Sequence, residues 1–280
     1  MTQHVSRRDA VRGLSLGTAG LGTAGLGTAG LGPAGFGTAA LAAQPASADQ
    51  GAAPAAPLAA AEQPAGLCVL QPQAVEGPYY FDPNQVRRDI AEDVPGAPVK
   101  LVLQIVDAQG CAPLTGLRVD IWHADARGIY SGYSGQGDTR DISTKGATYL
   151  RGTQMTGSDG RVTFRTIYPG WYPGRTPHIH IKVYLDRTTL VTGQCYFPDD
   201  VSAKIYRERA PYSARPVADT SNARDGIFND SLRDGGGTVF AMESEGDLVV
   251  ASLLIGVDRT GSAARKTGGW GDCMRGLIGR

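Results

Sequence analysis

The sequence has no excess of charge of either sign, because 27 Lys and Arg residues balance 27 Asp and Glu residues. Removal of residues 1–48, which hold three arginines and one aspartate, leaves 24 basic and 26 acidic residues. Such a balance provides no electrostatic attraction to nucleic acid or to an anionic membrane surface. We therefore expect a neutral or small polar partner and no nucleic acid.

Charge is absent altogether from residues 13–48. This stretch includes three tandem copies of LGTAG at residues 16–30. Its glycines and threonines make it a low-complexity segment that is too weakly apolar for a typical transmembrane helix. A weakly hydrophobic export segment is the better interpretation.

The ends of the uncharged stretch favour an export signal. The adjacent pair Arg7 and Arg8 precedes it, which is typical of the twin-arginine route. A small-x-small sequence that ends at Ala48 closes it, as at a signal cleavage site. We expect residues 1–48 to be removed and the protein to reach the cell envelope or the medium, with no membrane attachment afterwards. The Ala- and Pro-rich residues 49–66 would form a flexible lead-in.

Cysteine is scarce, and all four cysteines follow the predicted signal. No C-x-x-C pair occurs, which argues against a structural zinc site built on cysteine. An even number of cysteines in an exported chain instead favours two disulfides. Three pairings are possible, and we favour Cys68–Cys111 together with Cys195–Cys273.

Helical periodicity is nearly missing from the predicted domain, residues 67–280, where only residues 201–209 suggest a short helix. Short segments of period two, separated by Gly- and Pro-containing turns, predict strands instead. The predicted strands are 99–107, 117–124, 161–167, 178–185, 192–197 and 247–258. This pattern predicts a single all-β domain of the β-sandwich type. The long irregular stretches 131–147 and 207–237 would cover a functional site.

Only three histidines follow residue 48, and two of them, His178 and His180, lie one residue apart on a predicted strand. Alternate residues of a strand face the same side, so both imidazoles are able to bind one ion. The same pattern is typical of a polar strand face whose isoleucines point into the core. The third histidine, His123, would complete a three-histidine zinc site, although a structural role fits it equally well.

Carboxylates are scarce near these histidines, so tyrosine is the remaining candidate for a metal ligand. Tyr172 lies six residues before His178 in a proline-bounded loop, and Tyr130 follows the strand that carries Trp122. A phenol has a pKa of about 10 and becomes a good ligand only when a cation stabilises the phenolate. Two such hard oxygen donors would favour Fe(III) over zinc or copper. Taken singly, each tyrosine is more typical of a buried core residue.

Three segments, residues 76–80, 101–132 and 150–183, resemble the intradiol ring-cleavage dioxygenases. This family includes the catechol, hydroxyquinol and protocatechuate dioxygenases, and the resemblance spans residues 75–198. It implies a β-sandwich that holds one non-haem Fe(III) ion. The four ligands implied by the matching positions are Tyr130, Tyr172, His178 and His180.

The resemblance also implies a reaction and further site residues. A small aromatic diol would be cleaved by O2 to a cis,cis-muconate-type diacid. Tyr172 would be the displaceable ligand that accepts a proton, Arg175 would stabilise developing negative charge, and Gln194 would donate a hydrogen bond near the metal. Three residues would border the substrate: Gly77, Pro78 and Tyr79.

One departure from the family limits what the resemblance implies. Residues 49–74 are too few for the helical dimerisation region that precedes the core in catechol dioxygenases. The substrate and the oligomeric state therefore stay open, and a homo-oligomer is compatible with the sequence. Two other hypotheses also stay open: a zinc hydratase or hydrolase built on His123, His178 and His180, and a secreted sandwich that binds a partner without catalysis.

Overall fold

A computed structural model of the protein describes residues 68–137 and 139–263. The predicted signal, the predicted lead-in and Cys273 lie outside these residues. Within them, every helix is too short or too polar to cross a membrane.

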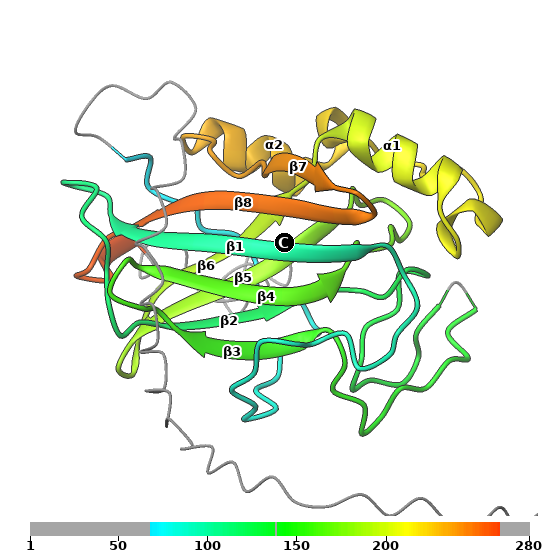
Figure 1. The fold of residues 1–280 in the computed structure, drawn as a ribbon, viewed down its shortest axis with the longest axis horizontal. Coiled ribbons are helices and arrows are strands. Elements are labelled where there is room, and N and C mark those ends of the chain that lie inside the picture. The colour runs from blue at the N-terminus through cyan, green and yellow to red at the C-terminus, as the bar shows by residue number, and fades with distance from the viewer. Residues whose placement is uncertain (1–67, 138, 264–280) are drawn as a thin grey trace, which may run out of the picture. The chain divides into compact units, whose positions relative to one another are not determined.

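Two four-stranded sheets pack face to face, which confirms the predicted all-β sandwich (Figure 1). The first sheet has the order β4 (Arg161–Ile167), β1 (Pro98–Asp107), β8 (Leu248–Val257), β7 (Ala241–Glu245). The second sheet has the order β3 (Arg151–Met155), β2 (Arg118–Trp122), β5 (His178–Leu185), β6 (Thr188–Tyr196). Neighbouring strands are antiparallel except β1 and β8, which are parallel.

The core lies between the sheets, and β5 shows how the sequence pattern builds it. Ile179, Ile181 and Val183 are fully buried in the main apolar cluster. Because side chains alternate along a strand, His178 and His180 are on the opposite, outer face of the second sheet. That face is also buried, since a covering segment crosses it.

The covering segment is residues 68–82, here called the N-terminal strap. Its backbone bonds to β6 through the Ala74 amide and the Thr192 carbonyl, 2.8 Å apart. It then crosses β5, where Glu76 pairs with Lys182, and reaches β2, where the Tyr80 hydroxyl donates to Asp120.

The strap starts at a disulfide between Cys68 and Cys111, which confirms the first predicted pair. In contrast to the predicted Cys195–Cys273 pair, Cys195 is a free thiol with no exposed surface. The Cys195 side chain belongs to the packed core between the sheets, where a second chain segment would have to enter to reach it.

Two helices flank the sandwich, α1 (Asp199–Glu208) and α2 (Gly226–Arg233). The first matches the predicted helix, shifted by two residues at its start. The second lies in residues 207–237, which were predicted to be irregular, and single 3-10 turns at Tyr212–Ala214 and Asn222–Arg224 precede it.

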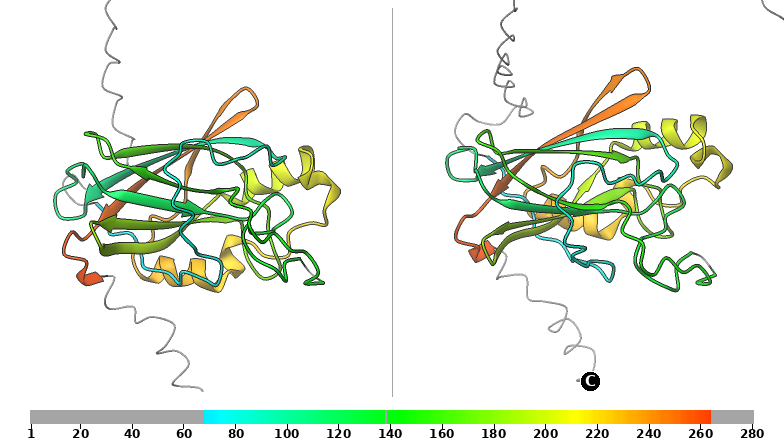
Figure 2. Two further views of the ribbon diagram at one scale, coloured as in Figure 1. Left: turned by 90° about the horizontal axis from the view of Figure 1, so that it is seen from below. Right: turned by 60° about the horizontal axis from the view of Figure 1, so that its bottom comes forward.

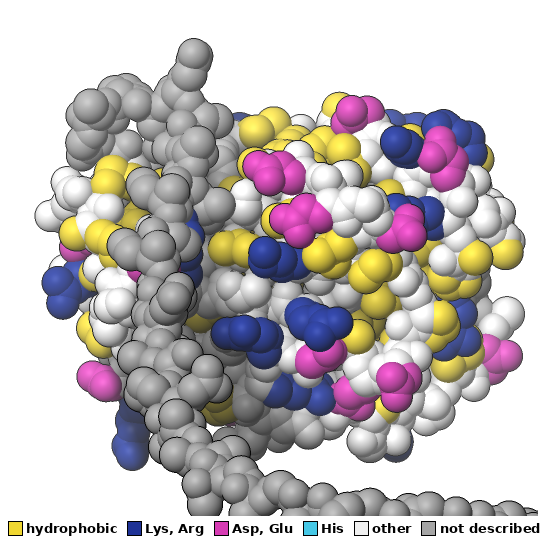
Figure 3. Space-filling model, viewed as in Figure 1, with side chains coloured by type: hydrophobic (Ala, Val, Ile, Leu, Met, Phe, Trp, Pro, Cys, Tyr) yellow, Lys and Arg dark blue, Asp and Glu magenta, His cyan; other side chains and the backbone are white. Residues whose placement is uncertain are grey.

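Strands β3 and β7 were also missed by the sequence patterns. β7 has the sequence AMESE and is almost entirely exposed, so it has no apolar face to detect. Figure 2 shows the β7–β8 hairpin extending past the neighbouring strands. On the face of the molecule drawn in Figure 3, basic and acidic side chains are interspersed, in keeping with the balanced charge of the sequence.

Candidate active site

The strand register of the second sheet places four chemically distinct side chains in one row on its outer face. Trp122 of β2 pairs with Arg151 of β3 on one side and with His180 of β5 on the other. His180 in turn pairs with Gln194 of β6. Directly opposed residues on neighbouring strands share a face. The row therefore crosses the whole sheet, and His178 lies beside it on the same face.

The structure brings the four predicted ligands together. The Tyr130 hydroxyl lies 3.1 Å from Nε2 of His180, and the Tyr172 hydroxyl lies 3.1 Å from Nε2 of His178. The ring centroids of the two histidines are 4.9 Å apart, and those of the two tyrosines are 5.9 Å apart. Two phenol oxygens and two imidazole nitrogens thus converge on one place.

Each histidine directs the Nε2 atom of an uncharged ring towards the tyrosine hydroxyls. His178 Nδ1 donates to the Thr176 carbonyl at 2.7 Å, which leaves the lone pair of its Nε2 facing Tyr172. Burial and then the charge of Arg175 lower the pKa of His178 to about 3. Burial and then His178 lower the pKa of His180 well below its ordinary value. Both rings are therefore available as ligands at neutral pH.

The two tyrosines need a cation before they can act as phenolates. Burial raises the pKa of Tyr130 well above 10 and also raises the pKa of Tyr172, where Arg175 partly offsets the effect. Only a multivalent ion in direct contact lowers such pKa values strongly. Ligands bonded to one ion at about 2.0–2.2 Å stand about 3 Å from each other. The two donor pairs at 3.1 Å have this spacing, so the four residues fit a metal ion.

His123 is not part of this group. It is fully buried, with Nε2 at 2.7 Å from the Thr166 hydroxyl of β4 and Nδ1 at 2.9 Å from the Ala124 carbonyl. Both ring nitrogens are therefore occupied inside the sandwich. Among the described residues, no group of three His, Cys, Asp or Glu side chains is arranged to hold a metal ion. The hypothesis of a three-histidine zinc site is wrong for this reason.

Arg175 is fixed beside Tyr172 by three contacts. Its Nε donates to Asp225 at 2.8 Å, and its Nη2 donates to the side-chain oxygen of Gln194. Its Nη1 faces the Tyr172 hydroxyl at 3.4 Å. Gln194 also donates to the Val75 carbonyl at 3.2 Å, which ties the strap to the same network.

Asp225 was missed by the sequence analysis. Its fully buried carboxylate accepts from Arg175, from the Thr176 amide at 3.0 Å, and from the first amides of α2 at Ile227 and Phe228. Burial alone would raise the pKa of Asp225, but Arg175 and the amides outweigh it and hold the pKa below 3.8. The available signal was an aspartate directly before a short helix, which is a preferred N-cap.

Arg151 was also missed, although it lies in the sheet row. Its guanidinium is 1% exposed and donates to the hydroxyl and carbonyl oxygens of Ser131, both at 2.8 Å. The ring centroid of Phe81 is 4.2 Å away, and burial lowers the pKa of Arg151 to about 10. Because Ser131 follows Tyr130 directly, these bonds anchor the chain next to a ligand.

Two glycines let the loops of the tyrosines touch through their backbones. A Cβ on Gly128, which has a φ of +85°, would lie 2.3 Å from the Trp171 carbonyl oxygen. A Cβ on Gly170 would lie 2.3 Å from the Ala126 carbonyl oxygen. The Gly170 amide also donates to the Asp125 carbonyl at 3.0 Å. Any side chain at either position would push the two loops apart.

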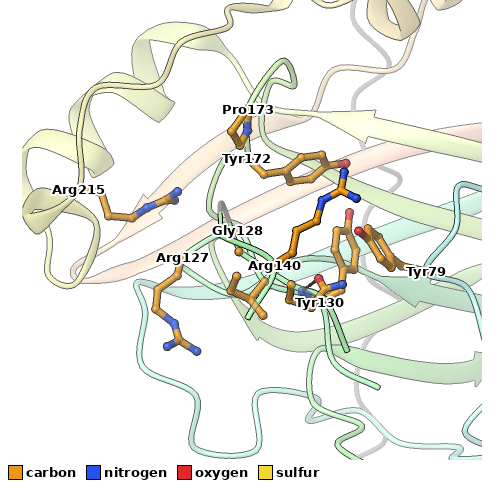
Figure 4. A pocket seen from close by; sticks show the side chains of 12 residues that line it. Tyr79, Arg127, Gly128, Tyr130, Arg140, Tyr172, Pro173 and Arg215 are labelled. Atoms are coloured by element: carbon orange, nitrogen blue, oxygen red, sulfur yellow. Dashed lines mark hydrogen bonds between the residues drawn. The ribbon is translucent and has the colours of Figure 1, made fainter. Parts of the chain in front are cut away.

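A pocket of about 380 Å³ opens beside the tyrosines, and Tyr79, Tyr130 and Tyr172 line it (Figure 4). The Tyr79 ring stacks on the Tyr130 ring with centroids 4.7 Å apart. Gly77 lies close to His180, because a Cβ there would be 3.5 Å from Cε1 of that histidine. Pro78 is exposed. Gly77 and Pro78 are not among the residues that line this pocket, and their role at the substrate stays a prediction.

The fold and the site have counterparts among known proteins. Residues 75–208 match the sequence model of a family described as dioxygenase. The structure is similar to that of an intradiol ring-cleavage dioxygenase from Tetranychus urticae, with 32% identity and a TM-score of 0.62. That similarity covers 68% of this chain and 95% of the other.

Curated relatives match over a shorter part of their length. The chain is 28% identical to catechol 1,2-dioxygenase 1 of Acinetobacter lwoffii over 160 residues, 49% of each protein. It is 30% identical to hydroxyquinol 1,2-dioxygenase of Rhizobium sp. (strain MTP-10005) over 133 residues, 40% of this chain and 41% of the relative. The matches thus span half or less of these relatives. Together with the solved structure, they establish that the chain belongs to the intradiol ring-cleavage dioxygenase family.

Proposed function

We propose that this protein is a non-haem Fe(III) dioxygenase that cleaves an aromatic 1,2-diol between its two hydroxyl-bearing carbons. Both atoms of O2 enter the product, a cis,cis-muconate-type diacid, so the reaction needs no external reductant. The observation that carries the proposal is the pairing of two phenol oxygens with two imidazole nitrogens at 3.1 Å, beside a pocket that both tyrosines line. The names of the relatives support the same reaction.

Tyr130, Tyr172, His178 and His180 would hold the iron. When bound, Fe(III) supplies a Lewis acid that accepts the diol oxygens and draws electron density from the ring, which opens the ring to attack by O2. The protein contributes the placement of the substrate, the movement of its protons and the exclusion of water.

Tyr172 is the ligand best placed to take a proton from the diol. It is partly exposed and lines the pocket, whereas Tyr130 is 1% exposed. Tyr130 is also held by the stacked Tyr79 ring and by a hydrogen bond from its amide to Gln136. With the metal bound, a diol proton would therefore move to the phenolate oxygen of Tyr172, which becomes a neutral hydroxyl and keeps the proton while the substrate is bound.

Arg175 provides a fixed positive charge at the same point. Arginine stays protonated at all working pH values, and Asp225 and Gln194 hold its guanidinium in one orientation. A preoriented charge stabilises negative charge that develops on the substrate without reorganisation. Nη1 of Arg175 would also face the protonated Tyr172 hydroxyl, which lies 3.4 Å from it.

The strap and Trp122 keep water from the sheet side of the site. Trp122 is 1% exposed and stacks on the His180 ring with centroids 4.7 Å apart. Tyr80 of the strap packs on Trp122 at 4.8 Å. Reactants therefore reach the metal ligands from the pocket.

Metal analysis, visible spectroscopy and oxygen uptake test this proposal together. The purified protein is expected to contain about one iron per chain, to show the visible absorption of ferric phenolate, and to consume O2 with catechol, hydroxyquinol or protocatechuate. A colourless protein with stoichiometric zinc would overturn the proposal. An iron-loaded, coloured protein that consumes no O2 with any of these diols would favour the non-catalytic binding module instead.

We also propose export by the twin-arginine route. The Arg7 and Arg8 pair and the uncharged repeat support it, and so does the Cys68–Cys111 disulfide, which is typical of oxidising compartments. Replacement of both arginines by lysine should retain the protein in the cytoplasm, whereas Arg12→Lys should not. Unchanged export of the double variant, measured by cell fractionation, would contradict this route.

A further inference from the structure

Two consecutive residues of the strap, Tyr79 and Tyr80, support one pair of predicted ligands from two sides. The Tyr79 ring stacks on Tyr130 with centroids 4.7 Å apart and an interplanar angle of 23°. The Tyr80 ring packs on Trp122 at 4.8 Å, and Trp122 in turn stacks on His180 at 4.7 Å with an interplanar angle of 11°. The Tyr130 hydroxyl and Nε2 of His180 are 3.1 Å apart, and these two residues are here called the supported pair.

Tyr80 is fixed in one orientation by residues of β2 and β5. Its hydroxyl donates to Asp120 of β2 at 2.9 Å and shares a hydrogen bond of 2.8 Å with the Tyr184 hydroxyl of β5. Asp120 is 4% exposed, and Nζ of Lys182 lies 4.6 Å from the centroid of the Tyr80 ring. A phenol that is bonded to a buried carboxylate and to a second hydroxyl, with a cation over its ring, has little freedom to turn away from Trp122.

The orientation of Tyr79 depends on the same part of the strap. The Tyr133 hydroxyl donates to the Tyr80 carbonyl at 2.8 Å, and the Tyr133 ring meets the Tyr79 ring edge-on, with centroids 5.3 Å apart. Tyr79 is therefore enclosed between Tyr133 and Tyr130, and Figure 4 shows it beside Tyr130 at the pocket. Because the Tyr80 backbone holds Tyr133, a displacement of Tyr80 would also loosen the contacts of Tyr79.

Tyr172 and His178, here called the open pair, are packed differently. Within residues 68–137 and 139–263, the ring contacts of these two side chains are edge-on or tilted, with centroids 4.9–6.0 Å apart. Tyr172 is also partly exposed at the pocket, whereas Tyr130 and His180 are 1% and 4% exposed. The strap therefore supports one donor pair and leaves the other able to rearrange.

We infer that Tyr80 is a positioning residue that aligns the supported pair for the metal and leaves the open pair able to rearrange when a substrate binds. This inference rests on the proposed function for the role of the four ligands. Groups that orient ligands before the metal binds contribute to metal affinity, although they do not touch the metal. Tyr80 acts in this way through Trp122 and through the strap backbone that holds Tyr79.

Hydrogen exchange of the metal-free protein tests the alignment without any metal. The Tyr130 amide, which donates to Gln136 at 3.2 Å, reports on the supported pair. The Thr176 amide, which donates to Asp225 at 3.0 Å, reports on the loop of the open pair. In Tyr80→Leu, the Tyr130 amide should exchange about tenfold faster, the effect of losing one aromatic contact, while the Thr176 amide should be unchanged. A variant that only destabilises the fold would accelerate both amides.

Iron affinity tests the same role in the loaded protein. Tyr80→Leu should bind Fe(III) roughly 10- to 100-fold more weakly, because the loss of a group that orients a metal ligand has an effect of this size. The measurement is competition with a chelator, followed by the visible absorption of the protein. Tyr80→Phe keeps the ring on Trp122 and loses only the hydroxyl, so its loss of affinity should be smaller. It also keeps the test available if Tyr80→Leu does not fold.

Tyr212→Phe is the matched control. Like Tyr80, Tyr212 has a hydroxyl with two hydrogen-bond partners, here the Ala97 amide and the Tyr168 carbonyl, but it belongs to the main apolar cluster. This variant should therefore lose stability without losing Fe(III) affinity. Wild-type Fe(III) affinity in both Tyr80 variants, an equal loss in Tyr212→Phe, or equal acceleration of the two reporter amides in Tyr80→Leu overturns the inference.

Oxygen uptake separates this inference from the proposed function. O2 consumption with a diol by the wild type, together with wild-type Fe(III) affinity in the Tyr80 variants, would refute the positioning role and support the dioxygenase. Weaker Fe(III) binding in the Tyr80 variants, with no O2 consumed on any diol by the iron-loaded wild type, would support the positioning role and refute the dioxygenase.

Discussion

Asp225 joins the start of α2 to the candidate metal site, because its carboxylate lies 2.8 Å from Nε of Arg175 and also caps the helix. The two residues are 50 positions apart in the chain. The orientation of Arg175 beside Tyr172 therefore depends on a carboxylate from a segment that contributes no metal ligand.

Asp225→Asn should separate the charge of this residue from its role as a helix cap. Asparagine is an equally good N-cap, so α2 should persist, but Arg175 would lose its buried counter-charge. Removal of one partner of a buried pair costs about 3–5 kcal/mol. Denaturant unfolding should show a loss near the lower figure, because Arg175 is partly exposed. Asp230→Asn, on an exposed part of the same helix, should change stability little.

The same carboxylate predicts a loss of stability in acid. The pKa of Asp225 is lower in the folded protein than its ordinary value of 3.8. Its contribution is therefore complete above about pH 4 and is lost as the pH falls through the folded pKa. Unfolding curves of wild type and Asp225→Asn should converge below pH 4. A constant difference between them down to pH 2 would contradict this prediction.

Tyr130→Phe and Tyr172→Phe should have different effects. Tyr130 is buried under Tyr79, so removal of its hydroxyl should lower metal affinity by more than about 100-fold. This effect is larger than the loss of affinity on removing a residue that only hydrogen-bonds to a metal ligand. Tyr172→Phe should keep the metal, shift the visible band and lower kcat more than it changes KM. Tyr149→Phe, outside the pocket lining, is the control. If neither substitution at Tyr130 or Tyr172 alters the spectrum, the ligand assignment is wrong.

His123 should make the metal-free protein sensitive to mild acid. Burial lowers the pKa of His123 from 6.5 to about 4. Above pH 6.5 the ring is neutral in both the folded and the unfolded protein. As the pH drops from 6.5 to 4, only the unfolded protein binds a proton at this ring, so the free energy of unfolding falls by about 3 kcal/mol for this group. His123→Gln should reduce the slope of unfolding free energy against pH in this window. An identical slope in the variant would show that His123 does not titrate as proposed.

Loss of the Cys68–Cys111 disulfide should destabilise the domain through the strap. The bond closes a loop of 43 residues, which corresponds to about 4 kcal/mol in the chain-entropy description. The double variant Cys68→Ser/Cys111→Ser should lose stability of this order in denaturant unfolding. Cys195→Ser instead places a hydroxyl in the core, and its loss of stability relative to the wild type should be the same with and without added reductant. Equal stability of the oxidised and reduced wild type would contradict the prediction.

The sequence predicted the parts of the site that lie within one element or match a family pattern. The spacing of His178 and His180 on a strand predicted two imidazoles on one face, and the resemblance supplied Tyr130 and Tyr172. Geometry then excluded His123, whose ring nitrogens are both used inside the sandwich. Sequence spacing alone had no means to show on which face of the sheet that histidine lies.

The sequence did not predict contacts between segments that are distant in the chain. Arg151 appears in the sequence as one charged residue in a polar stretch, and only the register of β3 against β2 places it in the row with His180. Asp225 lies in residues 207–237, which were predicted to be irregular, and its partner Arg175 is 50 positions away. The Cys195–Cys273 pair was predicted because an exported chain with an even number of cysteines favours disulfides. That rule does not indicate whether a cysteine is buried in the core.

The backbone contact between the loops of Gly128 and Gly170 has a consequence for how this site changes in evolution and in the laboratory. The spacing of the two phenols is set by main-chain atoms, so it does not depend on which side chains fill the pocket. Arg140 lies on the stretch between Tyr130 and β3, outside that contact. Arg140 lines the pocket, whereas Ser131 and Gln136 of the same stretch hold the chain beside Tyr130. Exchanges at Arg140 should therefore alter which diols are accepted while leaving the metal ligands in place, which makes this position suitable for redesigning specificity.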